Sequence, residues 1–103
     1  MKTKNKVLLP ITTLLLVFRT LKIVSAIETG KILFKDNCSV CHLHGNNIII
    51  PEKNLKHNTL EANGMNSKDA ISYQIINGKN GMPAFGGRLK EIEIEKIASY
   101  VLE

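Results

Sequence analysis

Cys38-Ser39-Val40-Cys41-His42 is the stretch that decides the fold of this 103-residue chain, and it contains the only two cysteines in the sequence. Residues three apart lie on one face of a helix, so each thiol can form a thioether with one vinyl group of a haem. The adjacent His42 then offers its imidazole to the iron. The motif therefore predicts a covalent haem c site, with Cys38 and Cys41 as attachment points and His42 as the first axial ligand.

Two other interpretations of the cysteine pair stay open from the residues alone. A thiol-disulfide centre needs a thioredoxin-like setting of strands and helix, and no strand pattern surrounds residues 38–42. A structural zinc site needs two further ligands at suitable spacing, and the only other histidines are His44 and His57. Both alternatives are less favoured than haem.

Residues 1–26 have the pattern of a secretory signal peptide. Three lysines within the first six residues form a basic start, Val7–Phe18 is mostly apolar, and Val24-Ser25-Ala26 offers small residues to a signal peptidase. The apolar stretch is shorter than the roughly 20 residues of a spanning helix, so a membrane anchor is the weaker alternative. We expect cleavage after Ala26 and a mature domain of residues 27–103 that is not membrane-anchored.

The positive net charge of the chain belongs to this expected signal peptide. Of the 14 lysine and arginine residues, five precede residue 27, which leaves nine to balance the 9 aspartate and glutamate residues. A formally neutral mature domain has no electrostatic reason to bind nucleic acid, and no nucleic-acid partner is expected.

The mature segment is short enough for one domain, and we expect an all-α fold of about four helices around one haem. The helices are predicted at about residues 28–37, 67–77 and 91–102, with a weaker turn of helix at 58–63. Thr29 is a candidate N-cap, and Asn77-Gly78 is a helix stop signal. No stretch alternates long enough for a strand, and Ile48-Ile49-Ile50 is interpreted as pocket lining.

The second axial ligand decides between electron transfer and chemistry at the iron. Four residues of the mature segment are candidates: Met65, Met82, His44 and His57. His44 lies too close to His42 to reach the other haem face, and His57 stands in a polar stretch typical of a surface. Met82 is favoured over Met65 because neighbouring glycines let the loop run close to a ring and Pro83 stiffens the turn. Met65 is interpreted as a core residue.

Ligation by His42 and Met82 leaves no vacant iron position, which predicts a one-electron carrier and not an enzyme. A haem gas sensor would require Met82 to be unbound, and a peroxidase would require an open iron face with an acid or base beside it.

The mature segment resembles cytochrome c6, the soluble photosynthetic class I c-type cytochrome of algae and cyanobacteria. The C-x-x-C-H run marks any c-type cytochrome, whereas the Met82–Leu89 stretch is far more specific to this family. The residues that carry the resemblance are Gly30-x-x-x-Phe34, Cys38–His42, Gly45-Asn46-Asn47, Pro51, Leu60–Asn63, Tyr73-Gln74, Asn77–Asn80, Met82–Leu89 and Tyr100-Val101-Leu102.

The resemblance implies a class I cytochrome c fold in which the first and last helices cross, with Gly30 and Phe34 against Tyr100. It also implies electron transfer from cytochrome f of the cytochrome b6f complex to photosystem I, in the thylakoid lumen of a plastid. Gln74 matches a glutamine that tunes the haem potential, and Arg88 matches an arginine that docks the photosystem. A surface polar residue is the alternative for each. We expect a monomer.

The main alternative function is a respiratory cytochrome c that donates to an oxidase, because the same chemistry serves either partner. That respiratory cytochrome would be periplasmic. The alternatives to a plastid location are a cyanobacterial thylakoid lumen and a bacterial periplasm.

Overall fold

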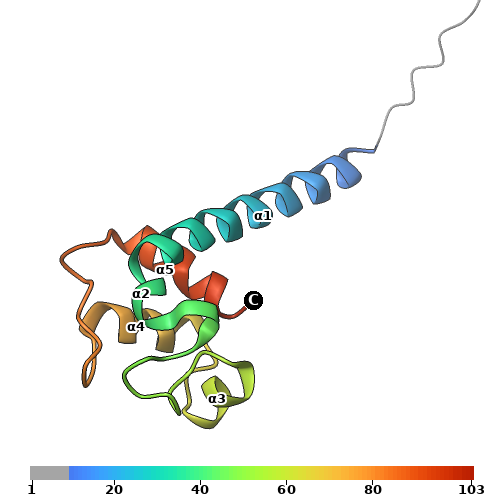
Figure 1. Cartoon of the computed structure of the whole chain (residues 1–103). Helices are drawn as coiled ribbons and strands as arrows, with labels where there is room; N and C mark the ends of the chain where they lie inside the picture. The colour runs from blue at the N-terminus through green and yellow to red at the C-terminus, as the bar shows by residue number, and fades with distance from the viewer. Residues whose placement is uncertain (1–9) are drawn as a thin grey trace, which may run out of the picture.

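The structure is a computed structural model that describes residues 10–103, and its ribbon shows helices joined by loops (Figure 1). The helices are α1 (Ile11–Asn37), α2 (Ser39–His42), α3 (His57–Ala62), α4 (Lys68–Asn77) and α5 (Glu91–Val101), with a 3-10 turn η1 at Leu43–Gly45. Among residues 10–103 the structure forms no β-strand, and an isolated bridge pairs Lys79 with Met82. The all-α prediction is confirmed.

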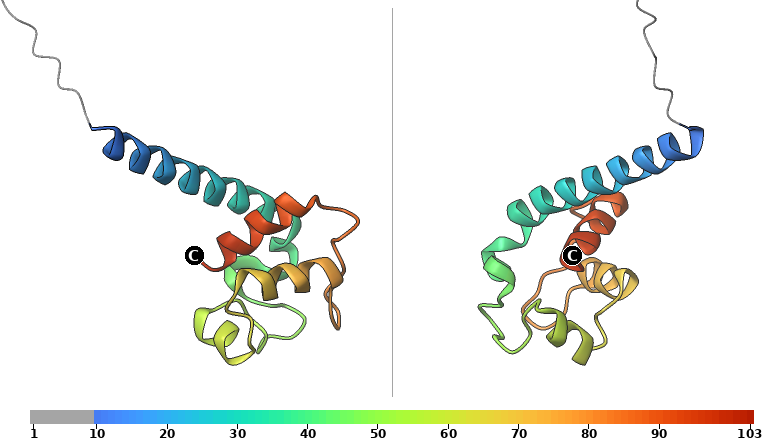
Figure 2. Two further views of the ribbon diagram at one scale, coloured as in Figure 1. Left: turned by 180° about the vertical axis from the view of Figure 1, so that it is seen from behind. Right: turned by 90° about the vertical axis from the view of Figure 1, so that its right-hand side faces the viewer.

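The C-terminal part of α1 crosses α5, as the views in Figures 1 and 2 agree. Gly30 lies buried at the crossing, where a Cβ atom would come within 2.9 Å of the backbone carbon of Lys96 and 3.0 Å of Tyr100 Cβ. One turn further along α1, the Phe34 ring meets the Tyr100 ring edge-on, with centroids 5.4 Å apart. The predicted contact of Gly30 and Phe34 with Tyr100 is therefore confirmed.

The buried core joins α4, α5 and the loop between them. It consists of Ile71, Ile75, Phe85, Ile94, Ile97 and Ala98. The α5 members stand at positions i, i+3 and i+4, the spacing that places side chains on one helix face. Met65 is partly buried and packs against this cluster, while its exclusion as an iron ligand stays a prediction.

α1 begins much earlier than the sequence predicts. The first helix was expected at about residue 28 with Thr29 as its cap, but the helix starts at Ile11 and Thr29 lies within it, donating its hydroxyl to the Ser25 carbonyl oxygen at 2.9 Å. The capping prediction is wrong because no glycine or proline interrupts residues 11–29, so the helix continues through the expected cleavage point. Within residues 10–103, no helix has both the length and the apolar character needed to cross a membrane.

The other helix ends follow local hydrogen bonding. The Ser67 hydroxyl accepts from the Ala70 N–H at 3.1 Å, and α4 stops at the predicted Asn77-Gly78 pair. Lys90 offers α5 no capping oxygen, yet Glu93 Oε1 reaches back to accept from the Lys90 N–H at 2.9 Å. This backward bond, typical of a capping box, helps to set the start of α5 at an N-cap residue whose side chain has no oxygen.

We expect Gly30→Ala to destabilise the protein by about 1–3 kcal/mol, because the new methyl group would force α1 away from the Lys96 backbone. Helix propensity alone predicts the opposite sign, a gain of about 1 kcal/mol. Denaturant unfolding of the haem-loaded protein measures the change. Gly87→Ala is the control, since nothing lies within 4 Å of a Cβ at that position. Equal stability of the two variants would contradict close packing at the crossing.

Candidate functional site

One cavity of about 490 Å³ gathers the residues that the sequence singles out. Its wall includes Cys38, Cys41, His42, Gln74, Met82 and Arg88. Pockets of about 300–1,000 Å³ are usual for cofactors and other small molecules. Side chains separated by up to 50 positions in the sequence therefore meet at one cavity of suitable size.

Most of the remaining wall is apolar. It includes Leu55, Leu60, Ile71, Ile75, Phe85 and Val101. Ile49 and Ile50 line the cavity, as predicted for the isoleucine run, whereas Ile48 does not and is 65% exposed. An apolar wall of this kind fits a flat, largely apolar cofactor, because filling the cavity would remove these side chains from water.

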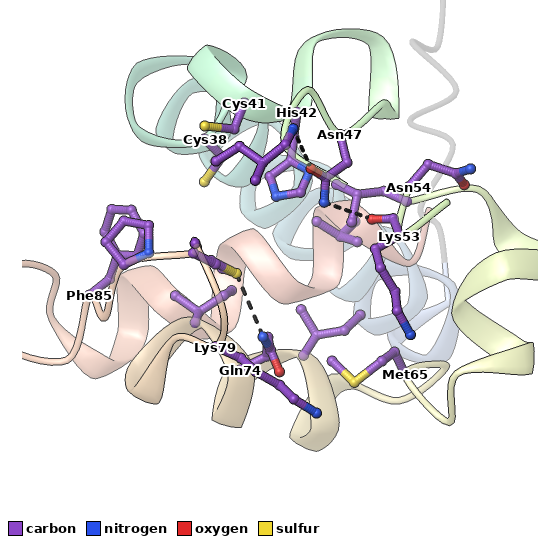
Figure 3. A pocket seen from close by; sticks show the side chains of 18 of the residues that line it. Cys38, Cys41, His42, Asn47, Lys53, Asn54, Met65, Gln74, Lys79 and Phe85 are labelled. Atoms are coloured by element: carbon purple, nitrogen blue, oxygen red, sulfur yellow. Dashed lines mark hydrogen bonds between the residues drawn. The ribbon is translucent and has the colours of Figure 1, made fainter. Parts of the chain in front are cut away.

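The two cysteines stand on the same side of the cavity as His42, at the junction of α1 and α2 (Figure 3). The two cysteines do not form a disulfide with each other, and both are half-buried. Burial raises the pKa of the Cys38 thiol from 9.0 to about 11, so this thiol is protonated at neutral pH. Catalytic cysteines of thiol-disulfide centres have lowered pKa values instead, which counts against that alternative.

The zinc alternative finds no ligand set in the part of the chain that the structure describes. Within residues 10–103, no three His, Cys, Asp or Glu side chains gather to hold a metal ion. His44 and His57 are both exposed and lie outside the cavity wall. The prediction that His57 is a surface residue is confirmed.

The His42 ring is held in one orientation by the backbone of the following turn. Its Nδ1 atom lies 2.9 Å from the carbonyl oxygen of Asn46. A carbonyl oxygen only accepts, so Nδ1 carries the proton and Nε2 keeps its lone pair. His44, at φ 55°, reverses the chain in η1 so that Asn46 returns beneath the ring. Such bonds orient ligating histidines and raise their basicity.

The contact of Asn46 with His42 is a feature of the site that the sequence patterns alone did not reveal. Asn46 acts through its backbone carbonyl, which every residue type possesses, so its identity carries no signal for this role. Asn47 next to it has a side-chain role: Nδ2 donates to the Lys53 carbonyl at 3.0 Å, and Oδ1 accepts from the N–H groups of Ile49 and Ile50. An asparagine at a chain reversal was the available signal for this loop.

Met82 lines the cavity from the loop between α4 and α5. Gln74 Nε2 lies 3.8 Å from the Met82 sulfur, the contact drawn as a dashed line in Figure 3. Gln74 stands on the opposite side of the cavity from His42 in that view. The structure therefore brings Gln74 directly to the methionine sulfur, a contact that the spacing of the two residues did not predict.

The backbone of this loop is held tightly at Gly78. Gly78 adopts φ 65° and ψ 174°, and a Cβ there would lie 2.5 Å from the Met82 carbonyl oxygen and 2.7 Å from the Pro83 carbonyl carbon. The Phe85 N–H donates to the Ile75 carbonyl at 2.8 Å and returns the loop to α4. The position of Met82 is thus set mainly by backbone contacts.

Arg88 stands exposed at the mouth of the cavity. Its guanidinium carbon lies 5.6 Å from the centroid of the Phe85 ring, the geometry of a cation–π contact. The contact with the ring leaves the Arg88 side chain exposed to solvent.

Comparison with known proteins gives concordant matches. Residues 25–101 match the family model described as "Cytochrome C oxidase, cbb3-type, subunit III". The chain is 60% identical over 76 residues to cytochrome c6 of Bumilleriopsis filiformis, covering 74% of this chain and 88% of that protein. It is 48% identical to cytochrome c6 of Pyropia yezoensis over 99% of this chain and 94% of that one. The solved structure of cytochrome c6 from the diatom Phaeodactylum tricornutum superposes with a TM-score of 0.71 at 44% identity, covering 74% and 90% of the two chains.

We expect Gly78→Ala to cost about 2–4 kcal/mol of stability, because the methyl group meets the Met82 and Pro83 backbone in a conformation that essentially only glycine adopts. Gly64→Ala is the matched control: φ is 67° there, but nothing lies within 4 Å of its Cβ position. It should cost only about 1 kcal/mol. Thermal unfolding of both variants measures the difference, and equal losses would show that Gly78 is not packed against the loop.

Proposed function

Because the chain belongs to the cytochrome c6 family, we propose that it carries electrons from cytochrome f of the cytochrome b6f complex to photosystem I. The chain is a c-type cytochrome with covalently bound haem c, and it is an electron carrier and not an enzyme. The electron-transfer partners, the iron ligands and the location in the cell are what we propose beyond this.

The proposed haem-binding residues are those of the cavity wall. Cys38 and Cys41 would form the thioethers, and His42 and Met82 would be the axial ligands. When bound, the haem supplies a one-electron redox centre whose potential depends on its axial ligands. The observation that carries the proposal is the orientation of His42. The Asn46 carbonyl accepts from Nδ1, which leaves Nε2 as the atom that would ligate the iron. Gln74, whose amide contacts the Met82 sulfur, stands on the opposite side of the cavity.

The surrounding residues would keep the site rigid. The His42–Asn46 bond maintains one tautomer, and Gln74 donates toward the Met82 sulfur. A donor at the sulfur withdraws electron density from it, which is the proposed way in which Gln74 tunes the potential. The apolar wall excludes water, so little solvent has to reorganise during electron transfer.

The proposed location is the thylakoid lumen of a plastid, with residues 1–26 removed and residues 27–103 acting as a monomer. The exposure of α1 supports removal of this segment. Leu15, Phe18 and Leu21 are 53%, 60% and 59% exposed, and a helix with such a surface is a liability in water. Gly30 and Phe34, which pack on α5, lie after the proposed cleavage point.

Donation to an oxidase is the second candidate, because the matching family model is named for an oxidase subunit. The two are separated by flash kinetics, in which the reduced holoprotein re-reduces isolated photosystem I. We expect a rate well above that of an unrelated cytochrome of similar charge and potential. A rate equal to that of the unrelated cytochrome would reject the photosynthetic assignment.

Met82→Ala should open the sixth iron position, because it removes the proposed sulfur ligand from the cavity wall. The reduction potential should fall, the weak iron–sulfur absorption band should vanish, and carbon monoxide should bind to the reduced protein. Met65→Ala is the control, because it removes a thioether from the same cavity wall without removing the proposed ligand. An unchanged spectrum in Met82→Ala would exclude Met82 as the ligand, and carbon monoxide binding by the unmutated protein would favour a gas sensor.

Arg88→Gln should slow transfer to photosystem I by about 3- to 10-fold at low salt, because a charge at the cavity mouth is lost. The difference should shrink at high salt, where charges are screened. Arg88→Lys, which keeps the charge, should retain most of the rate. Equal low-salt rates for Arg88→Gln and the unmutated protein would remove Arg88 from the docking surface.

A further inference from the structure

The chain contains three asparagines that are followed directly by glycine: Asn63-Gly64, Asn77-Gly78 and Asn80-Gly81. In this pair the backbone nitrogen of glycine reaches the asparagine side-chain carbon easily, because glycine has no side chain to obstruct the approach. The three pairs share this local chemistry, so the tertiary structure decides which of them can react.

Asn63-Gly64 is held by three hydrogen bonds. Asn63 Nδ2 donates to the Thr59 carbonyl at 2.9 Å, and its Oδ1 accepts from Lys53 Nζ at 2.9 Å. The Gly64 N–H donates to the Glu61 carbonyl at 3.1 Å. Both the amide that would leave and the nitrogen that would attack are therefore engaged.

Asn77-Gly78 is held in a similar way at the end of α4. Asn77 Nδ2 donates to the Tyr73 carbonyl at 2.9 Å, and the Gly78 N–H donates to the Gln74 carbonyl at 2.8 Å. Reaction at this pair would require the last turn of the helix to open.

Asn80-Gly81 differs from both. The two residues form the exposed tip of the loop, with φ values of 48° and 39°. The turn is closed by two bonds between Lys79 and Met82, each 3.0 Å, which do not involve the pair itself. Within residues 10–103, no hydrogen bond engages the Asn80 side-chain amide or the Gly81 N–H. Both reacting groups are thus open to solvent.

We propose that Asn80-Gly81 is a site of spontaneous deamidation in the loop that carries Met82. The Gly81 nitrogen attacks the Asn80 side-chain carbonyl carbon, a carbon–nitrogen bond forms, and the amide group leaves as ammonia with the proton from Gly81. Water then opens the five-membered imide at either carbonyl and leaves aspartate or isoaspartate. The net change replaces an amide by a carboxyl group, and no electron is transferred.

This modification would alter the cavity. Asn80 is part of the cavity wall, so a new carboxylate would stand at its margin. A negative charge near a redox centre stabilises the oxidised state and lowers the reduction potential. The isoaspartate product also adds one methylene to the main chain two residues before Met82. The change in potential rests on the proposed haem ligation, whereas the chemical step does not.

The site is tested by incubating the holoprotein in mildly alkaline buffer and following all three pairs by peptide mass mapping. Asn63 and Asn77 can react only after at least two hydrogen bonds open, and each bond of about 1 kcal/mol lowers the fraction of open molecules about fivefold. Asn80 should therefore convert at least about tenfold faster than Asn63 or Asn77. In denaturant the three rates should converge, because only the local sequence remains. Equal rates in the native protein, or faster conversion at Asn63 or Asn77, would overturn the proposal.

The consequence is tested by reduction potentials before and after incubation. The reduction potential of the unmutated protein should fall as Asn80 converts, and N80D should show the lower potential from the start. The potential of Asn80→Gly, whatever its starting value, should not change during the incubation. Glycine accepts the positive φ and has no amide to lose, which makes Asn80→Gly the matched control. An equal loss in Asn80→Gly would refute the link to this residue. Absence of methionine ligation would instead appear in the spectrum before incubation and leave the mass result unaffected.

Discussion

The close approach of α1 to α5 at Gly30 is the constraint on which the rest of the structure depends. α1 ends at Asn37, directly before the haem motif, while α5 packs on α4 and thereby supports the loop that carries Met82. The distance between the two sides of the cavity is therefore set where a glycine lets one helix touch the backbone of the other. A larger residue there would shift the wall that carries His42 relative to the wall that carries Met82.

Backbone groups control much of the site. The Asn46 carbonyl orients His42, and the conformation at Gly78 brings the chain back toward α4 so that Met82 reaches the cavity. Backbone atoms are positioned by whole elements, so they move less than long side chains do. A rigid site suits an electron carrier, because its two redox states then require little rearrangement. Because the walls are held apart in this way, their apolar side chains are removed from water only when a cofactor fills the cavity.

The Met82 loop combines this order with a chemical weakness. Asn80 and Gly81 suit the tip because both tolerate the positive φ angles that a tight turn requires. The same two residue types form the pair most prone to imide formation when no hydrogen bond holds them. At Asn63 and Asn77, helix-end hydrogen bonds keep an equivalent sequence from reacting. At Asn80, the residue type that suits the tight turn is therefore also the one that is prone to deamidation.

The sequence by itself determined the covalent attachment motif, the all-α class, the helices near 67–77 and 91–102, and Met82 as the candidate sixth ligand, because these depend on short spacing, on apolar periodicity and on the glycines and proline beside Met82. Family resemblance supplied the helix crossing and Gln74. Only the tertiary structure decided that the Asn46 carbonyl holds His42, that Gln74 meets the Met82 sulfur and that α1 begins at Ile11. A carbonyl has no sequence signature, and a contact between two elements depends on how those elements pack. The start of α1 was missed because an uninterrupted apolar stretch favours helix whatever its role in targeting.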